Sequence, residues 1–432
     1  MILIVFLFIK GVEYAVALVN LHHLDKYGGV IPRGFEDWVD KNTLTGMRDY
    51  SLENGRLELL SSGLDILLVV LFIFGGILDW YNSFLVQQGW SFYATGTAFF
   101  LFLVYASIII QAPFDLYSTF SIEEKYGFNK QTLRLWLLDT LKSLVLTTVI
   151  LVPVLLVVFW LIRITPLWWW LVVWLFLLFF KLFMLFISPY VLEPLFNKFT
   201  PVEDEELVSG IKELMAKAGL AINRVFVMDA SRRSGHGNAY FSGIGRVKRI
   251  VLYDTLLKKN TREEILAILA HEAGHWKKKH IYKRLIVTEI LSLPIFYLVW
   301  WVVQNDYLVR IFNISQPTLF VKLLLVSFCL MLAVFPFKPV FAWFSRKHEW
   351  EADRFGVDLS GSPQALARAL VKLGRDNLAN LHPHPWRIVL YYSHPPLSHR
   401  VKALLRAAGE QGRTKAGYSE KGIEEPAPGA PE

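Results

Sequence analysis

The 432-residue sequence has one cysteine, few charged residues and no concentrated basic segment. Cys329 alone can form neither an intrachain disulfide nor a zinc cluster of cysteines. Charged residues make up 19% of the chain, and the net charge of +8 is not gathered in a basic stripe with interleaved aromatics, so nucleic-acid binding is not expected. No positive residue precedes the first apolar run, and Lys10 and Glu13 interrupt it. We therefore interpret this run as a retained helix rather than a signal peptide, although Ala15–Ala17 resembles a cleavage site.

Long hydrophobic runs are abundant instead, and hydrophobic residues make up 54% of the sequence. A helix of about 20 apolar residues spans the roughly 30 Å hydrocarbon core of a bilayer. Seven segments have this character, at about residues 1–20, 59–80, 90–112, 136–160, 166–187, 284–304 and 319–342. The sequence therefore predicts a mostly α-helical, polytopic membrane protein with seven transmembrane helices, and the lipid bilayer is its first expected partner.

The loops predict how these helices are oriented, because Lys and Arg collect on the cytoplasmic side. Both residue types are concentrated after the first and third spans, at Lys26, Arg33, Lys41, Arg48, Arg56, Lys125, Lys130 and Arg134, whereas the loop at 81–88 has none. Residues 1–187 are expected to hold the first five spans, and residues 284–342 the last two. We therefore expect the segments 188–283 and 343–408 to lie in the cytoplasm and to form one domain. The Gly-, Pro- and Glu-rich residues 409–432 are predicted to be disordered.

Ionisable residues also fall within or beside the apolar spans, at Lys10, Glu13, Asp65, Asp79, Lys142, Lys181 and Glu289. Charges in hydrocarbon are costly, so they usually pair with one another or face a wet cavity. The sequence leaves two interpretations open: pairing between helices, or a water-filled space among them.

A metal-binding pattern of the H-E-x-x-H type occurs at His271–His275. Residues four apart lie on one face of a helix, so His271 and His275 can bind one Zn²⁺, with Glu272 beside it as general base. The alternative is an ordinary helix with solvated histidines. Since a catalytic zinc site takes three protein ligands and leaves one position open, a third ligand is needed.

The third ligand is expected in the segment at 345–359, where Glu349 and Asp353 share one helix face. Glu349 would bind zinc, and Asp353 would accept a hydrogen bond from the outer nitrogen of a histidine ligand. His348 and Glu351 are chemically possible rivals. His280 would face away from His275 in a continuous helix, so we expect a structural or interfacial role for it.

A short strand at Asn238–Phe241 is predicted between the strands Arg224–Met228 and Arg249–Tyr253. At the edge of a sheet, Asn238, Ala239 and Tyr240 would hold an extended peptide through main-chain hydrogen bonds. A hairpin with a turn-forming Asn is the alternative. Further along, His394 and Arg400 would stabilise the oxyanion of peptide hydrolysis, unless they only form a turn that caps the last helix.

These blocks together resemble the integral-membrane CaaX prenyl protease family, type I, the a-factor-converting zinc proteases. The resemblance runs to about residue 406 and is carried by "FSIEEKYGFNKQT" (120–132), "PLFNKFTPV" (194–202), "GHGNAYFSG" (235–243), "RIVLYDTLL" (249–257), "HEAGHWKKKH" (271–280), "SQPTL" (315–319), "EWEAD" (349–353), "KLGRDNL" (372–378) and "YSHPPLSHRV" (392–401).

The resemblance implies that seven helices surround a water-filled chamber capped by a gluzincin-like α+β zinc domain. It also implies a role for each matching residue. His271, His275 and Glu349 would bind one Zn²⁺, with Glu272 as general base and Asp353 as the acid behind a ligand; Asn238 would lie at the peptide-binding strand, and His394 and Arg400 near the metal.

The predicted function is a membrane-embedded zinc metalloendopeptidase, acting as a monomer, that cuts near the carboxyl terminus of prenylated CaaX-type peptides. Two alternatives stay open: a quality-control protease for damaged or stalled membrane proteins, and a non-catalytic chamber that binds lipid or peptide. The compact loops and the lack of a di-lysine or HDEL-type retrieval signal favour a bacterial plasma membrane over the endoplasmic reticulum of a eukaryote.

Overall fold

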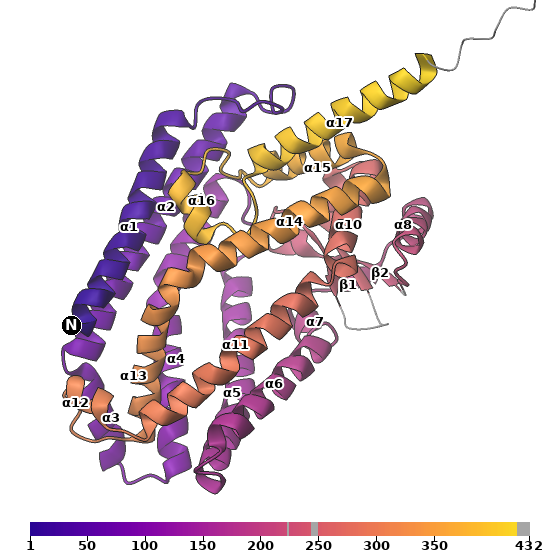
Figure 1. Cartoon of the computed structure of the whole chain (residues 1–432). Coiled ribbons are helices and arrows are strands. Elements are labelled where there is room, and N and C mark those ends of the chain that lie inside the picture. The colour runs from indigo at the N-terminus through magenta and orange to yellow at the C-terminus, as the bar shows by residue number, and fades with distance from the viewer. Residues whose placement is uncertain (223, 243–248, 421–432) are drawn as a thin grey trace, which may run out of the picture.

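The computed structural model describes residues 1–222, 224–242 and 249–420, and within that part seven helical segments are long and apolar enough to cross a membrane. They are built on α1 (Ile2–Tyr27), α2 (Lys41–Val69), α4 (Phe92–Tyr117), α5 (Leu133–Ile164), α6 (Trp169–Ile187), α11 (His280–Val303) and α13 (Leu319–Val334). The predicted number and order of spans are confirmed. In Figure 1 α1 and α2 run along the left side of the molecule to its top, and α4, α5, α6, α11 and α13 extend through its lower half.

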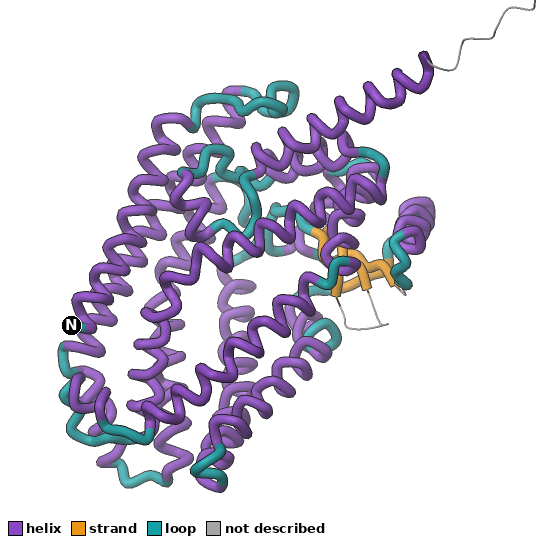
Figure 2. Tube along the Cα trace, viewed as in Figure 1, coloured by secondary structure: helices purple, strands orange, loops and turns teal. Residues whose placement is uncertain are grey.

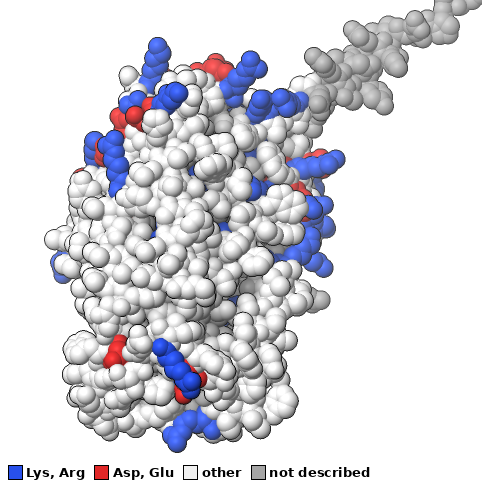
Figure 3. Space-filling view, turned by 60° about the vertical axis from the view of Figure 1, so that its left-hand side comes forward, with Lys and Arg blue, Asp and Glu red and all other residues white. Residues whose placement is uncertain are grey.

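Charged residues are unevenly distributed over the surface in a way that fits a bilayer. Figure 3 shows a broad belt with few Lys, Arg, Asp or Glu side chains, and a gathering of them at the end that carries the loops and α17 (Leu397–Glu420). Prolines inside α4, α5 and α11 (Pro113, Pro153 and Pro294) are tolerated as membrane helices allow, because neighbouring helices re-satisfy the freed backbone groups.

Several of the charges within the spans pair with one another, whereas Asp79 accepts hydrogen bonds from the N–H and the hydroxyl of Ser315. Lys181 of α6 forms an ion pair with Glu289 of α11. Lys338 donates to Glu13 of α1 at 2.6 Å between Nζ and Oε1, and Lys10 donates to the same carboxylate at 2.8 Å. For Lys10, Glu13, Lys181 and Glu289 the structure favours pairing, since each of these side chains has an opposite charge beside it.

The remaining elements form an extramembrane domain, defined here as β1–β4, α8–α10 and α14–α17. It contains a four-stranded sheet in the order β1 (Phe199–Pro201), β2 (Arg224–Met228), β4 (Arg249–Tyr253) and β3 (Ala239–Ser242). Strands β2 and β4 are parallel, and both outer strands are antiparallel to their neighbours. Figure 2 shows this small sheet as the one cluster of strands in an otherwise helical molecule, as far as the described residues go.

Helices cover the sheet and connect it to the membrane. α7 (Leu192–Phe196) joins α6 to the sheet, and α8 (Glu205–Lys217), α9 (Asp254–Lys259), α10 (Arg262–Lys277), α14 (Lys338–Ser360), α15 (Pro363–Asp376) and α16 (Pro385–Tyr391) belong to the domain. The short helices α3 (Ile77–Gln87) and α12 (Tyr307–Ile311) lie between membrane helices at the opposite end of the molecule (Figure 1). α10 leads into α11 after two residues, and α13 continues through the short turn Phe335–Phe337 into α14. Two helices of the domain are thus extensions of membrane helices.

Residues near the amino terminus contribute to this domain as well. Phe35, Val39, Leu44 and Met47 are buried in one apolar cluster with side chains of α15 and α17. The domain therefore draws on the loop after α1 and the start of α2, in addition to the two predicted segments. α17 remains helical to Glu420, although disorder was predicted from residue 409; the prolines that favoured disorder begin only at Pro426, and 421–432 lie outside the described residues.

Candidate metal centre

The two histidines of the H-E-x-x-H pattern lie on α10, whose start is fixed by a capping box. The Thr261 side chain accepts from the Glu264 backbone N–H, and the Glu264 carboxylate accepts from the Thr261 N–H at 2.8 Å. Apolar side chains of α10, among them Ile265 and Leu269, are buried against the sheet and α8. This burial turns the opposite face of α10, with His271 and His275, towards α14.

Helices α10 and α14 pack unusually closely because glycines lie at their contact. A Cβ added at Gly274 would lie 2.9 Å from the Ala352 Cα, and one added at Gly356 would lie 2.9 Å from the backbone nitrogen of His271. Real Cβ atoms do not approach so closely without a shift of their neighbours. The small residues therefore allow the approach that brings Glu349 of α14 to the histidines of α10.

The three predicted ligands converge in the structure. His271, His275 and Glu349 each offer a ligand atom within 4.8 Å of the other two. The Nε2 atoms of the histidines are 3.3 Å apart, and Glu349 Oε1 is 3.3 Å from His275 Nε2. Two imidazole nitrogens and one carboxylate match the donor set of a catalytic zinc site.

The environment of Glu349 also fits a cation. Its Oε2 atom is buried without a hydrogen-bond partner among the described residues. Burial would raise the pKa of the Glu349 carboxyl, but the neighbouring His271 and His275 outweigh it and hold this pKa below its usual range. A buried carboxylate oxygen without a donor requires an explanation, and a bound metal ion supplies one.

Asp353 and Arg400 form a second layer behind His271. Asp353 Oδ1 lies 2.8 Å from His271 Nδ1, so the carboxylate orients the ring and leaves Nε2 towards the metal position. Arg400 donates to both Asp353 oxygens, from Nε at 2.8 Å and from Nη2 at 2.6 Å. Burial opposes the charge of Asp353, but hydrogen bonds from His271 and Arg400 hold its pKa below the usual range. Arg400 is buried, and its guanidinium is directed at carboxylates.

His280 takes a position that was predicted wrongly. Its Nδ1 lies 3.1 Å from the Nδ1 of His275 rather than facing away from it. The prediction assumed a continuous helix, but α10 ends at Lys277 and Lys279 adopts a left-handed conformation with φ 58°. The chain turns there, so α11 starts in a new direction with buried His280 behind His275.

The rival ligands His348 and Glu351 belong to the surroundings of His280. The Glu351 carboxylate lies 3.1 Å from His280 Nε2, and the His348 ring stacks on the His280 ring at 4.1 Å between centroids. Both side chains therefore support the outer side of His275 and not the metal triangle.

Glu272 and His394 are the remaining side chains for which the sequence predicts a catalytic role. Glu272 follows His271 on α10, and burial raises the pKa of its carboxyl, as suits a base that must both accept and release a proton. His394 lies in the turn before the buried Pro395, with its Nε2 3.3 Å from Glu349 Oε1 and with its side chain 62% exposed. It is thus next to the metal position and accessible to a bound molecule.

The predicted peptide-binding strand is at the edge of the sheet. β3 pairs with β4 on one side, and no further strand pairs with its other side among the described residues. It lies beside α10, where Phe241 and Trp276 approach to 6.3 Å between ring centroids. Asn238, just before β3, is exposed and its side chain accepts from the Ala239 N–H at 2.8 Å.

The side chains of Ala239 and Tyr240 have other contacts. Ala239 is buried in the core, and the Tyr240 hydroxyl donates to Glu193 of α7 at 2.8 Å. Arg249 of β4 donates to the same carboxylate at 2.6 Å. Any contact of these two β3 residues with a peptide would therefore use their main chain.

One group was missed by the sequence analysis. His236 lies 3.2 Å from the Glu123 carboxylate at its Nε2 and 3.2 Å from the Asn377 side chain at its Nδ1. Asn377 also accepts from the Gly237 N–H at 3.1 Å. These contacts join the end of the third span and the end of α15 to the start of β3. The blocks "GHG" and "KLGRDNL" contain these residues, but no spacing rule links positions so far apart.

Comparison with known proteins supports this arrangement. A family model described as the CAAX prenyl protease N-terminal domain with five membrane helices matches residues 20–198, and that of peptidase family M48 matches residues 201–408. A protein named CAAX prenyl protease 1 from Saccharomyces cerevisiae is 32% identical over 87% of this chain and 88% of its own length. The CAAX prenyl protease 1 homolog of Homo sapiens is 33% identical over 85% of this chain and 84% of its own.

The solved structures give the same result. The crystal structure of Ste24p from S. mikatae superposes with a TM-score of 0.87 at 30% identity, covering 94% of this chain and 98% of that one. The predicted resemblance, the polytopic fold and the enzyme class are thereby confirmed, and the alternative of a non-catalytic chamber is not supported. The chain belongs to peptidase family M48, as an integral-membrane metallopeptidase of the CAAX prenyl protease 1 type.

Proposed function

We propose that the chain is a zinc endopeptidase that cuts near the carboxyl terminus of prenylated CaaX-type peptides. The observation that carries the proposal is the convergence of His271, His275 and Glu349 beside an edge of the sheet with which no described strand pairs. The relatives' printed names supply the substrate class. All these residues come from one chain, which supports action as a monomer.

Zinc at these three ligands would supply Lewis acidity for the scissile carbonyl and for a water molecule. Glu272 takes a proton from that water at its carboxylate and passes it to the departing amine. His394 donates a hydrogen bond to the oxygen on which negative charge develops. Asp353 holds His271 in the tautomer that leaves Nε2 unprotonated, and Arg400 acts through Asp353 rather than on the oxyanion.

The substrate peptide would pair with the outer edge of β3 as an additional strand. Asn238, exposed at the start of this strand, would hold a main-chain group of the peptide. Because α10 lies next to β3, a peptide on this edge passes the metal position. α10 and α14, which carry the proposed ligands, adjoin the membrane helices α11 and α13. A prenyl group can therefore stay among the spans while the peptide reaches the site.

The extramembrane domain, with residues 188–283 and 343–408 at its centre, is proposed to face the cytoplasm, and a chamber among the helices would admit water. Loop charges support this orientation. Lys258→Cys in a Cys329→Ser background would react in sealed inverted vesicles, and not in right-side-out vesicles, with a membrane-impermeant maleimide. The opposite result would reverse the orientation. The bacterial plasma membrane stays a prediction.

Substrate choice tests the function. The purified protein is given a farnesylated CaaX-ended peptide and the same peptide without the lipid, and kcat/KM is measured for both. A kcat/KM at least about tenfold higher for the farnesylated peptide supports the proposal. Burial of only a few methylene groups of the lipid would produce a difference of this size. Equal cleavage of both would favour quality control of membrane proteins instead.

A further inference from the structure

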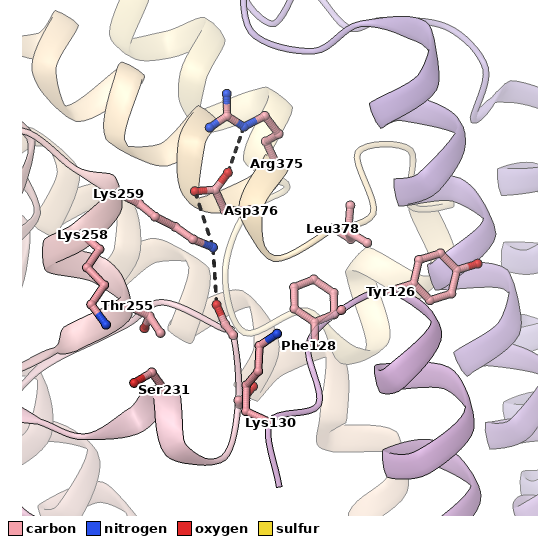
Figure 4. Close-up of a pocket in the computed structure, with 13 residues that line it drawn as sticks. Tyr126, Phe128, Lys130, Ser231, Thr255, Lys258, Lys259, Arg375, Asp376 and Leu378 are labelled. Carbon is pink, nitrogen blue, oxygen red and sulfur yellow. Dashed lines mark hydrogen bonds and ion pairs between the residues drawn. The ribbon is translucent and has the colours of Figure 1, made fainter.

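A cavity of about 460 Å³ lies outside the metal centre, where four segments of the chain meet. Its wall comes from the loop between α4 and α5, the turn after β2, helix α9 and the end of α15. In Figure 4 the side chains of Lys130, Lys258, Lys259 and Arg375 surround it. Its volume is within the range of about 300–1,000 Å³ that is usual for small-molecule sites.

Positive charge exceeds negative charge on this wall. Asp376 is the one carboxylate among the lining residues, and two cations share it: Arg375 donates from Nε at 2.9 Å, and Lys259 Nζ lies at 3.9 Å. Lys130 has no ion pair among the described residues. Among the described residues Lys130 is therefore a cation without a carboxylate partner, and Lys259 and Arg375 share a single carboxylate.

The other polar groups of the wall also suit an anion. Lys258 lies 3.6 Å from Asp254, but that carboxylate already accepts from the Ser231 hydroxyl and, at 2.9 Å, from the Ser231 N–H. Ser234 Oγ accepts from the His236 N–H at 3.3 Å, and within the described residues its own hydrogen has no acceptor. Lysine and arginine with a free hydroxyl are the donors that bind phosphate oxygens.

The same wall is joined to the peptide-binding strand. Gly235 lines the cavity and is followed by His236, whose ring stacks on Phe128 of the opposite wall at 4.0 Å between centroids. Asn377, next to Arg375 and Asp376, accepts from the Gly237 N–H at 3.1 Å. A ligand that draws these walls together would stabilise the segment that leads directly into β3.

We propose that this cavity binds a small molecule with one or more phosphate groups and that binding orders β3, which strengthens peptide binding. The effect on the peptide rests on the proposed function, whereas the binding itself does not. The phosphate groups come either from a soluble phosphorylated molecule or from the headgroup of an anionic phospholipid, since the loop at 124–132 joins two membrane helices.

Binding is measured with the full-length protein in detergent, with inositol trisphosphate as the soluble probe and nanodiscs containing phosphatidylinositol 4-phosphate as the lipid probe. The double variant Lys130→Gln/Lys258→Gln should raise the Kd of the probe by about a hundredfold or more, because it removes two charge-assisted hydrogen bonds. Lys217→Gln/Lys402→Gln removes the same charge from exposed positions of α8 and α17 and should leave Kd within about twofold.

Binding of inositol trisphosphate would identify a soluble phosphorylated molecule as the ligand, and binding of the nanodiscs would identify a phospholipid headgroup. Failure of the wild type to bind either probe, or equal weakening by both double variants, would overturn the proposal. Hydrogen exchange of the amides at 235–242 should slow when the probe binds, and unchanged exchange would overturn the link to β3. None of these measurements needs cleavage, so a protein that binds the probe but does not cut the farnesylated peptide refutes the proposed function alone.

Discussion

Replacing Gly356 with alanine should push apart α10 and α14, the two helices that carry the proposed metal ligands. The added Cβ would lie 2.9 Å from the backbone nitrogen and 3.0 Å from the Cα of His271. Ordinary contacts begin near 3.4 Å, so the first ligand must move by about 0.5 Å. Zinc–ligand distances tolerate only about 0.2 Å. We expect the zinc dissociation constant to rise roughly 10–100-fold, as for other losses of support around a metal ligand.

The assay is competition for zinc between the purified protein and a chelator of known affinity, with the thermal midpoint measured in parallel. Overpacking should also destabilise the fold by roughly 1–3 kcal/mol. Gly46→Ala is the matched control, because this glycine of α2 has no atom within 4 Å of an added Cβ. If Gly356→Ala binds zinc as tightly as both the wild type and the control, the contact between α10 and α14 does not determine the metal site, and the reasoning is refuted.

Other substitutions test the layers around the metal. Asp353→Asn should weaken zinc binding roughly 10–100-fold, because His271 loses its acceptor and Arg400 its charged partner; unchanged zinc content after dialysis would contradict this. His280→Ala should lower kcat/KM roughly tenfold by freeing the ring of His275, and unaltered kinetics would show that this contact has no role. Asn238→Ala should raise KM by roughly 3–10-fold with kcat and zinc content little changed, whereas a lost metal would contradict a role in peptide binding. Removing zinc with a chelator should abolish cleavage, and adding Zn²⁺ should restore it; activity that survives the chelator would contradict the metal mechanism.

Local patterns in the sequence predicted the features that depend on neighbours along the chain. Apolar length predicted the seven spans, and the spacing of His271 and His275 placed the two proposed ligands on one helix face. The same four-residue spacing placed Glu349 and Asp353 together on α14. The spans follow from apolar length, and the shared helix faces follow from helix periodicity alone.

Features that depend on a turn of the chain or on contacts between distant residues could not be predicted from local sequence patterns. The turn at Lys279 brings His280 behind His275, and lysine is not a residue from which a left-handed conformation is expected. The contacts of His236 with Glu123 and Asn377 join positions more than a hundred residues apart. The burial of residues near 35–47 against α15 and α17 likewise depends on how the spans assemble, which no local periodicity encodes.

The most direct test of the account is cleavage of the farnesylated peptide by the wild type and by Glu272→Ala, with the zinc content of both measured. The account predicts that each protein holds about one zinc per chain. It also predicts that only the wild type cuts, because the variant retains the ligands His271, His275 and Glu349 but lacks the base. A wild type without zinc, or a variant that cuts as fast as the wild type, would contradict the central claim.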